Sequence, residues 1–377
     1  MLSFVVTALL FGLILGVVIN IHELGHFFAA KSCGMKVEEF SFGFGPKLFS
    51  RKVGDTEYIL KLFPIGGYVK ILGEESSIKS KHSFSEKSPI AKIWVAFAGV
   101  LMNSILAVIL IYVVLIMKDF TYSGIPYYED FNAWFGQQEA VWAYPVTVVE
   151  VDKDGGLEYL DLEVPFEILS VNGNAIAAVE DLRDELSGFA GESVELEIHT
   201  FSGDTAVSGD TVVEEVDVSD EGTIGVYTAD DIKVWEIRYT GVQKYLSGFL
   251  HYLNMVETNF FVIGKLIGQS FSEGTPAPVV KSFSGPIGVF AVIDIVKKYG
   301  GLVGILDLTA MLNLALAITN CIPFPALDGG HVAVIVIEAI RGKPLDEKLK
   351  NRIFGIGMIL LFGFIILISI KDVLQFF

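Results

Sequence analysis

The stretch VVINIHELGHFFAAKSCG, residues 17–34, places two histidines and a glutamate directly after an apolar run that begins near the first residue. On a helix, His22 and His26 lie four positions apart, so their rings project from one face and can share one Zn²⁺. Glu23 is close enough to act on a water molecule there. Ionisable groups at membrane depth are costly and usually mark a functional site. The pattern therefore favours a zinc centre at the end of a membrane helix.

The composition of the chain indicates a membrane protein. Of its 377 residues, 52% are hydrophobic and 19% are charged, and the mean hydropathy is +0.55. A helix needs about 20 apolar residues to cross a bilayer core, and four blocks come near that length. The four expected spans are residues 4–20, 93–117, roughly 302–324 and 353–370. The net charge of −18 argues against a nucleic-acid partner.

Charge is unevenly distributed along the chain, and this sets the expected orientation. Residues 31–92 carry eleven Lys and Arg, whereas residues 118–243 carry five against 28 Asp and Glu. The short segment 341–352 carries five Lys and Arg. By the positive-inside rule, the two basic segments are cytoplasmic and the acidic segment is external. We therefore expect a multi-pass protein of the inner (plasma) membrane, with both termini and the acidic domain outside the cytoplasm.

The segments between the spans show other patterns. Residues 37–72 combine alternating β-branched and aromatic residues with turn-forming Gly and Pro, which predicts several short strands or hairpins in a membrane-associated sheet. Residues 118–142 are typical of an irregular linker, and residues 143–240 of a small α+β domain. Residues 244–271 and 284–298 have the pattern of amphipathic helices outside the membrane or at its surface.

These patterns predict a multi-pass α-helical membrane protein with about four transmembrane helices, a membrane-associated β-rich segment and an extracytoplasmic α+β domain. The expected segments are a first span with HExxH at 1–30, a cytoplasmic or membrane-associated β region at 31–92, a second span at 93–117, a linker at 118–142, the extracytoplasmic domain at 143–240, amphipathic helices at 241–300, a third span with an LDGG motif at 301–340, a cytoplasmic loop at 341–352 and a fourth span at 353–377.

A catalytic zinc site usually has three protein ligands, so a third ligand must come from elsewhere at similar depth. The third span ends in NLALAITNCIPFPALDGGH, residues 313–331, where Asp328 follows two prolines that interrupt helix hydrogen bonding. In the expected topology, HELGH and LDGG both lie at the inner ends of their spans. Asp328 is therefore the expected third ligand, and His331 is a rival. The other histidines, expected to be isolated and exposed, are His82, His199 and His251.

Each motif also has a reading without a metal. The two histidines can cap the end of the first span, with Glu23 paired to Lys31 or extended towards the interface. Asp-Gly is a common turn dipeptide, so Asp328 can simply begin a turn that ends a helix. The agreement in depth between the two motifs favours the metal reading over both alternatives.

Several ordered motifs resemble the site-2 protease family of M50-type intramembrane zinc metalloproteases. The similarity is to its bacterial regulator-of-sigma-E-protease (RIP metalloprotease) members. The motifs that carry it, which span most of the chain outside residues 118–240, are HELGH, FSFGFGPKL, FPIGGYVKILGE, AGVLMN, SGPIGV and NCIPFPALDGGH.

The resemblance implies roles for individual residues. It implies that His22, His26 and Asp328 hold Zn²⁺ and that Glu23 is the catalytic base. It also implies that Asn320 helps to hold substrate, whereas Asn103 in the second span has a structural role. An exposed edge of the β region can pair with a locally unwound substrate, and the residues expected to do so are Gly66, Gly67, Tyr68 and Val69.

The external segment is similar to a single PDZ domain through FEILSVNGNAI and EDLRDEL. It departs from the usual pattern at GGLEYLDLEVPFEIL, residues 155–169, where such domains tend to show AGL followed by GD. Peptide binding in its groove and a steric gate against bulky substrates therefore both stay open.

The resulting hypothesis is an intramembrane zinc endopeptidase that cleaves transmembrane segments of membrane proteins, such as anti-sigma factors or signal-peptide remnants. Its expected partners are transmembrane protein substrates and membrane lipid. One alternative is a catalytically inactive membrane scaffold that recruits partners through its acidic domain. Another is a transporter with an ion site at the broken third span, which the absence of a detectable internal repeat disfavours.

Overall fold

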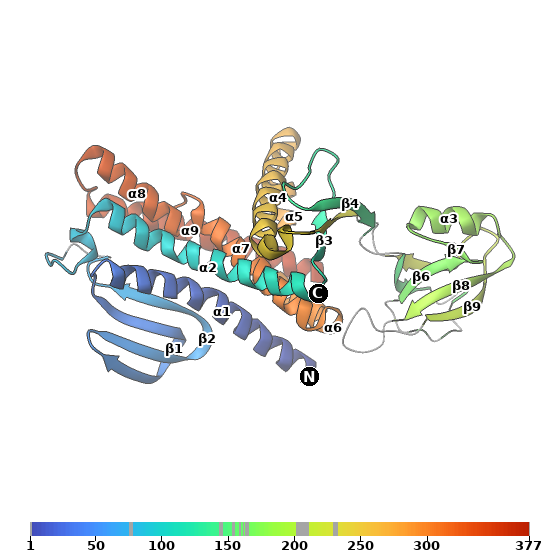
Figure 1. Ribbon diagram of the computed structural model, residues 1–377, viewed down its shortest axis with the longest axis horizontal. Helices are drawn as coiled ribbons and strands as arrows, with labels where there is room; N and C mark the ends of the chain where they lie inside the picture. Colours follow the sequence, from blue (N-terminus) through green and yellow to red (C-terminus); the bar gives the residue numbers. More distant parts are fainter. Residues whose placement is uncertain are drawn as a thin grey trace. The chain divides into compact units, whose positions relative to one another are not determined.

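The computed structural model describes residues 2–376 except for short segments. The segments left out are 75–77, 143–145, 153–154, 158–159, 161, 163–165, 201–210 and 229–232. The chain divides into two compact units (Figure 1). The helical unit comprises Met1–Val114, His251–Val296 and Gly304–Phe377, and the sheet unit comprises Leu115–Leu250 and Lys297–Val303.

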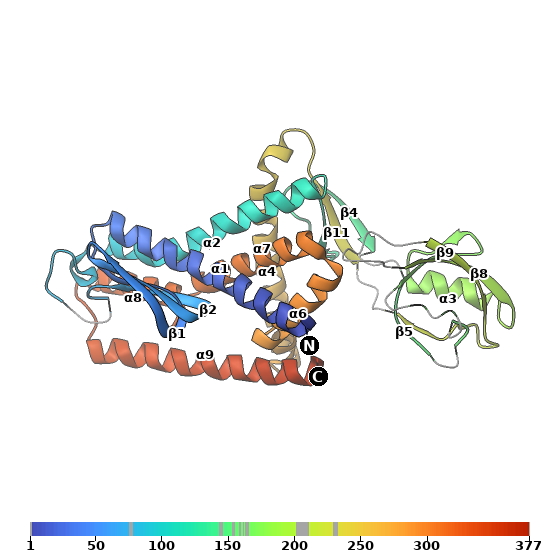
Figure 2. The same cartoon turned by 90° about the horizontal axis from the view of Figure 1, so that it is seen from below.

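Long helices build the helical unit. Its helices are α1 (Leu2–Ser32), α2 (Pro89–Met117), α4 (Gln243–Glu273), α5 (Ala277–Ser282), α6 (Pro286–Tyr299), α7 (Gly301–Cys321), α8 (Asp328–Arg341) and α9 (Glu347–Phe376). A short 3-10 helix, Phe84–Glu86, precedes α2. One end each of α2, α4, α6 and α7 belongs to the sheet unit. Figure 1 shows α1 and α2 side by side, and Figure 2 shows that they cross at an angle; they meet where Gly25 of α1 lies against the backbone of Ala98 on α2.

Among the described residues, five stretches of helix are long and apolar enough to cross a membrane. They are Ser3–Ser32, Pro89–Met117, Ala277–Lys298, Gly301–Cys321 and Glu347–Leu374. The chain is a multi-pass membrane protein with additional β structure. Four of these stretches coincide with the spans expected from the sequence. Ala277–Lys298 is a further candidate by length and composition, so the number of crossings and the orientation stay predictions.

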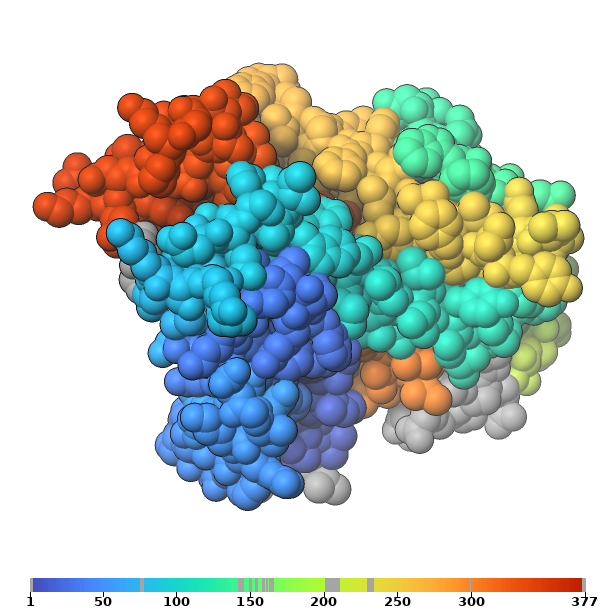
Figure 3. Space-filling view, turned by 60° about the vertical axis from the view of Figure 1, so that its left-hand side comes forward, coloured from blue at the N-terminus to red at the C-terminus, as the bar shows by residue number. Residues whose placement is uncertain are grey.

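One bent hairpin, β1 (Val37–Val53) and β2 (Thr56–Ile71), lies beside α1 (Figures 1 and 3). Strand β2 bends back on itself and pairs with β1 on both sides, because Phe40 of β1 lies between Val69 and Tyr58, which both belong to β2. Of the short strands or hairpins expected here, the structure has a hairpin: two long strands fold over so that residues 37–42 lie between residues 57–60 and residues 67–71. Residues 67–71 consequently form one edge of the sheet.

The two faces of the hairpin differ in polarity. Phe49, Leu60 and Phe42 lie opposite one another in one row and are 62%, 44% and 38% exposed. On the other face, Tyr68 donates a hydrogen bond from its hydroxyl to the Glu39 carboxylate at 2.6 Å. Burial and this hydrogen bond raise the pKa of Tyr68 to about 12, so its side chain is neutral. A hairpin with one exposed apolar face and one face on which polar side chains hydrogen-bond to each other suits the membrane-associated position expected for this region.

The helical unit buries polar side chains and exposes apolar ones. His251, expected from the sequence to be exposed, is fully buried on α4, so that prediction is wrong. The next position, Tyr252, donates a hydrogen bond from its hydroxyl to Ser104 of α2 at 2.8 Å. The polar side of α4 faces the protein here, which reverses the pattern of a helix that packs in water.

A buried carboxylate near the end of α9 holds the start of α6. Asp372 is fully buried and accepts backbone N–H bonds from Gly285 and Gly288, both at 2.8 Å. Those N–H groups lie at the start of α6, where a helix has no internal acceptor for them. The SGPIGV motif is therefore the capped beginning of α6.

The sheet unit contains a six-stranded antiparallel sheet. Its strands are β5 (Thr147–Val151), β6 (Phe166–Val171), β7 (Asn174–Ala175), β8 (Ser193–Thr200), β9 (Thr211–Asp217) and β10 (Val226–Thr228), in the order β10-β5-β6-β8-β9 with β7 on β6. Helix α3 (Val179–Ser187) buries Leu182 and Leu186 in the same apolar core as Phe166 and Ile168. The strands and the helix match the α+β pattern expected from the sequence.

A second, three-stranded sheet corrects the prediction of an irregular linker at 118–142. Its strands are β3 (Thr121–Pro126), β4 (Gln137–Trp142) and β11 (Lys233–Arg238), in the order β3-β11-β4. β11 supplies the central strand from about 90 residues later in the chain. Part of the stretch 155–169, where the sequence departs from the usual PDZ pattern, lies outside the described residues.

Candidate metal centre

The helix α1 carries three of the expected site residues without interruption. His22 and His26 lie one turn apart, and their ring centroids are 4.7 Å apart with the rings nearly perpendicular, at 79°. His22 is buried, at 6% exposure. The two imidazoles therefore project from one face of the helix, as the HExxH spacing predicts.

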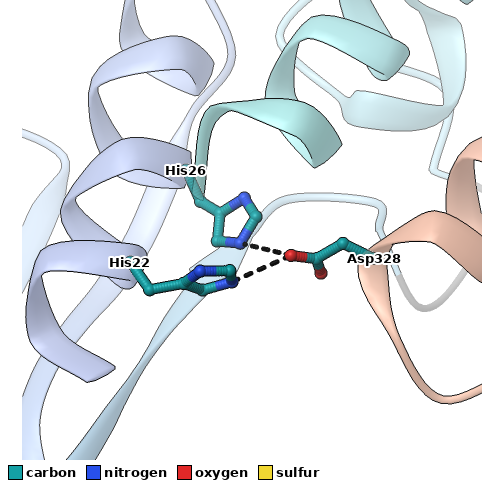
Figure 4. Close-up of side chains that lie close together, drawn as sticks. All are labelled: His22, His26 and Asp328. Carbon is teal, nitrogen blue, oxygen red and sulfur yellow. Dashed lines mark ion pairs between the residues drawn. The ribbon is translucent and has the colours of Figure 1, made fainter. Parts of the chain in front are cut away.

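Asp328 meets both histidines from the other end of the chain. Its Oδ2 atom lies 2.8 Å from His22 Nε2 and 3.4 Å from His26 Nε2 (Figure 4). The remaining histidines of the sequence do not join this group: His331 stacks on Phe354, with ring centroids 4.2 Å apart. The structure thus brings together the three residues that the sequence singles out as metal ligands.

A break between α7 and α8 places Asp328. Helix α7 ends at Cys321, and α8 begins at Asp328 itself. The two intervening prolines cannot continue the helix, as the sequence analysis expects. A Cβ atom on Gly329 or Gly330 would collide with backbone carbonyls of the connecting loop. Only glycine therefore allows the loop to fold this closely over the start of α8.

The backbone of α2 orients the imidazoles. His26 Nδ1 lies 2.8 Å from the carbonyl oxygen of Val95, so it donates a hydrogen bond and leaves Nε2 as the free acceptor that faces Asp328. Gly99 of α2 lies directly over both rings: a Cβ atom there would stand 2.6 Å from His22 Nε2 and 2.7 Å from His26 Nε2. The space around the two nitrogens exists because this residue has no side chain.

These three side chains fit a zinc ion. Tetrahedral zinc with bonds of about 2.0–2.2 Å to nitrogen and oxygen places its ligand atoms about 3.3 Å apart. The separations of Asp328 Oδ2 from His22 Nε2 and His26 Nε2, 2.8 and 3.4 Å, bracket that value, and all three atoms lie within 4.8 Å of one another. Two imidazoles and one carboxylate also form a common donor set for catalytic zinc. A small opening of the group is enough to admit the ion.

Glu23 lies beside these ligands and faces the same cavity. The cavity has a volume of about 240 Å³, and its lining includes His22, Glu23, His26, Asp328, Tyr68 and Val69. The Glu23 carboxylate accepts a hydrogen bond from the backbone N–H of Val69. The Glu23 carboxylate, the three candidate ligand side chains and one edge of the hairpin therefore border the same cavity.

The structure places the other expected site residues at two positions. Tyr68 and Val69 line the cavity, and Gly66 and Gly67 precede them on β2, against α1. Asn320, 8% exposed on α7, lines a second cavity of about 300 Å³ that Asp328 and Gly329 also border. Sequence reasoning did not single out the Val95 carbonyl or Gly99, although Gly99 belongs to the quoted AGVLMN motif.

Comparison with known proteins agrees with this geometry. The family model described as Peptidase family M50 matches residues 10–364. The chain belongs to this family. The prediction of an M50-type, site-2 protease family member is thereby confirmed. A protein from Clostridium perfringens, provisionally named a zinc metalloprotease, is 32% identical over 356 residues, which cover 94% of this chain and 95% of the relative.

Two further relatives carry the same provisional name of zinc metalloprotease. The relative from Fusobacterium nucleatum is 30% identical over 380 residues, which cover 98% of this chain and 99% of the relative. The relative from a Nostoc species is 30% identical over 376 residues, which cover 96% and 94%. These similarities extend over nearly the whole length of each chain, so they include both units of this M50 protein.

Proposed function

We propose that this M50 protein is an intramembrane zinc endopeptidase that cleaves transmembrane segments of membrane proteins. The convergence of His22, His26 and Asp328 on one point, with Glu23 in the same cavity, is the observation that carries the proposal. The names of the relatives support zinc as the metal.

The chemistry follows from the lining of the cavity. When bound, zinc supplies a Lewis acid that polarises a peptide carbonyl and makes water more acidic. Glu23 accepts the proton of the attacking water and returns it to the leaving amine. The Val69 N–H holds the Glu23 carboxylate towards the cavity, and the Val95 carbonyl holds His26 in the tautomer that leaves Nε2 free.

The hairpin supplies a surface for the substrate. A helical segment must unwind before its carbonyl groups can be attacked, and an unwound segment needs partners for its backbone. Residues 67–71 pair with residues 37–42 on one side, and no strand within the described ranges pairs with their other side. An extended substrate can therefore lie along Gly67, Tyr68 and Val69, while Asn320 contacts it from the second cavity beside Asp328.

The six-stranded sheet with α3, within residues 143–240 of the sheet unit, is proposed to be the PDZ-like domain of this protease, outside the cytoplasm. A groove of about 310 Å³ lies between α3 and β10, and β10 is the edge strand of its sheet. An edge strand beside a helix can bind an extended peptide. Titration of the purified protein with C-terminal peptides distinguishes a binding groove from a steric gate. A binding groove gives saturable binding, and Arg183→Glu on α3, in the lining of the groove, weakens it; a steric gate gives no saturable binding.

The decisive experiment combines metal content with proteolysis. The purified wild-type protein should contain about one zinc per chain and should cut at least one member of a panel of single-span membrane peptides. Glu23→Gln should keep the zinc and lose about 10²–10⁴-fold in cleavage rate, which is the usual contribution of a general base. Zinc binding without cleavage of any peptide would favour the inactive scaffold, and ion flux into liposomes would favour the transporter.

Proline substitution tests the role of the hairpin edge. Val69→Pro removes the backbone N–H that faces the cavity and contacts Glu23, so slower cleavage at unchanged zinc content is expected both from the loss of substrate pairing and from the loss of the contact with Glu23. Lys52→Pro, in the segment 47–53 that pairs with the far side of the same sheet, is the matched control for damage to the hairpin. Equal turnover by the wild type and Val69→Pro would contradict substrate pairing at this edge.

A further inference from the structure

Asn20 is a buried amide on α1, just ahead of the metal ligands. It is 5% exposed, and it lies two residues before His22 and three before Glu23. Its Nδ2 donates hydrogen bonds to the carbonyl of Gly16, 2.7 Å away, and to the carbonyl of Gly66 on β2, 3.0 Å away. One amide group therefore joins the metal-binding helix to the strand beside it.

The contact with β2 is close and specific. A bond to the carbonyl four residues earlier would use only one N–H of an asparagine in a helix, and the second N–H here crosses to the hairpin. A Cβ atom on Gly67 would stand 2.6 Å from Asn20 Oδ1, so only glycine allows this approach. The Oδ1 atom itself is buried without a hydrogen-bond partner among the described residues, which is costly in an apolar helix.

Two side chains of α1 thus bond to one short segment of β2, residues 66–69. Asn20 holds the Gly66 carbonyl, and Glu23 holds the Val69 N–H. The same turn of helix carries His22 and leads into His26. The position of residues 66–69 relative to the metal ligands is therefore set by two hydrogen bonds, of which only the Asn20 bond lies outside the proposed proton-transfer chemistry.

The contacts of residues 66–69 with α1 also set the position of an extended substrate that lies along this strand. Successive residues of a strand advance by about 3.3 Å, so a slip of the strand by one residue would bring a neighbouring peptide bond to the ligands. We propose that Asn20 is a positioning residue that fixes the register between the substrate-holding strand and the metal centre, and thereby selects which peptide bond is cut. The proposal rests on the proposed endopeptidase function.

The test compares cleavage positions. The full-length, zinc-loaded protein is incubated with the single-span peptide that the wild type cuts best, and the products are identified by mass spectrometry. For Asn20→Ala we expect the ratio of products cut at neighbouring bonds to the wild-type product to rise about 3- to 10-fold, as the loss of one ordinary hydrogen bond allows. Asn259→Ala on α4 is the control, since its Nδ2 bonds only to the helix carbonyl four residues earlier, at 2.8 Å.

A second variant separates positioning from folding. Asn20→Asp keeps the volume but replaces the Nδ2 donor by an oxygen that repels the Gly66 carbonyl, so it should shift the cleavage position as the alanine variant does. A slower reaction at an unmoved bond in both variants would overturn the proposal, and so would loss of zinc from both. Failure of the wild type to cut any peptide would instead refute the proposed function.

Discussion

The two units of this protein have opposite interiors. The sheet unit buries an apolar cluster around Phe166, Ile168 and Leu196, as a domain in water does. The helical unit buries Asn20 and His22 while it exposes many large apolar side chains, which suits a hydrocarbon solvent. The difference shows which contacts matter in each unit. Contacts between apolar groups stabilise the sheet unit, whereas in the helical unit the buried polar groups Asn20 and His22 lie at or beside the candidate metal centre.

The largest expected effect comes from removing the partly buried Asp328 carboxylate of the helical unit. Asp328→Ala deletes one of the three ligand groups, so zinc content should fall and cleavage should drop by more than the 10–100-fold typical of outer contacts to a metal ligand. Zinc analysis and the peptide assay measure both. Asp55→Ala, at an exposed turn of the hairpin, is the control. Full activity of Asp328→Ala would break the comparison, because the carboxylate that contacts both imidazoles would then have no chemical role.

A smaller loss is expected from adding a single methyl group. Gly99→Ala places a Cβ atom within 2.7 Å of a ligand nitrogen on each imidazole, so we expect about a 10–100-fold loss of metal affinity or activity. Competition with a zinc chelator measures the affinity. Gly355→Ala on α9 adds the same methyl group where no atom lies within 4 Å, and it should behave as wild type. Equal zinc affinity in both variants would show that α2 does not shape the site.

In the sheet unit, the corresponding test removes apolar contacts. Phe166→Ala should destabilise that unit by about 3–5 kcal/mol, because a fully buried aromatic ring on the central strand β6 is lost. Hydrogen exchange of the β6 and β8 amides measures the change, and zinc content should not change. Val213→Ala, at a side chain that is 55% exposed on β9, should have a much smaller effect. Loss of zinc from Phe166→Ala would contradict the separation of the two interiors.

The smallest expected effect concerns a helix end. The Asp181 carboxylate accepts the backbone N–H of Ala178 at 2.9 Å at the start of α3, so Asp181→Ala should cost about 1 kcal/mol in the sheet unit. Chemical denaturation, monitored by hydrogen exchange of the α3 amides, measures this loss of stability. The neighbouring Glu180→Ala is the control. A change in cleavage rate at saturating peptide would sharpen the comparison by tying α3 to substrate handling.

The sequence was sufficient to single out the three side chains that the structure brings together, but not the groups that orient them. HExxH spacing and the proline-broken LDGG segment identify His22, His26 and Asp328, because those residue types and spacings belong to the chemistry itself. The Val95 carbonyl carries no sequence signal, since every residue has one. Gly99 does carry a signal, a glycine in the interior of a helix, but only the neighbouring imidazoles explain it.

The errors of the fold prediction have two physical causes. Strands β3 and β4 were expected to be a linker because their common partner, β11, lies far away in the sequence, and no local pattern reveals such pairing. His251 was expected to be exposed because polar residues face water in soluble proteins, whereas α4 turns it inward. The identification of strands β5, β6, β8 and β9 succeeded because their alternating pattern is local.

The break between α7 and α8 also sets a time order during synthesis. Asp328 is made about 300 residues after His26, and at about 5–20 residues per second this takes roughly 15–60 s. Throughout that interval, α1 is already complete with its two imidazoles and Glu23, but the carboxylate that closes the ligand set does not yet exist. The proposed zinc site therefore cannot be complete until α8 has been made.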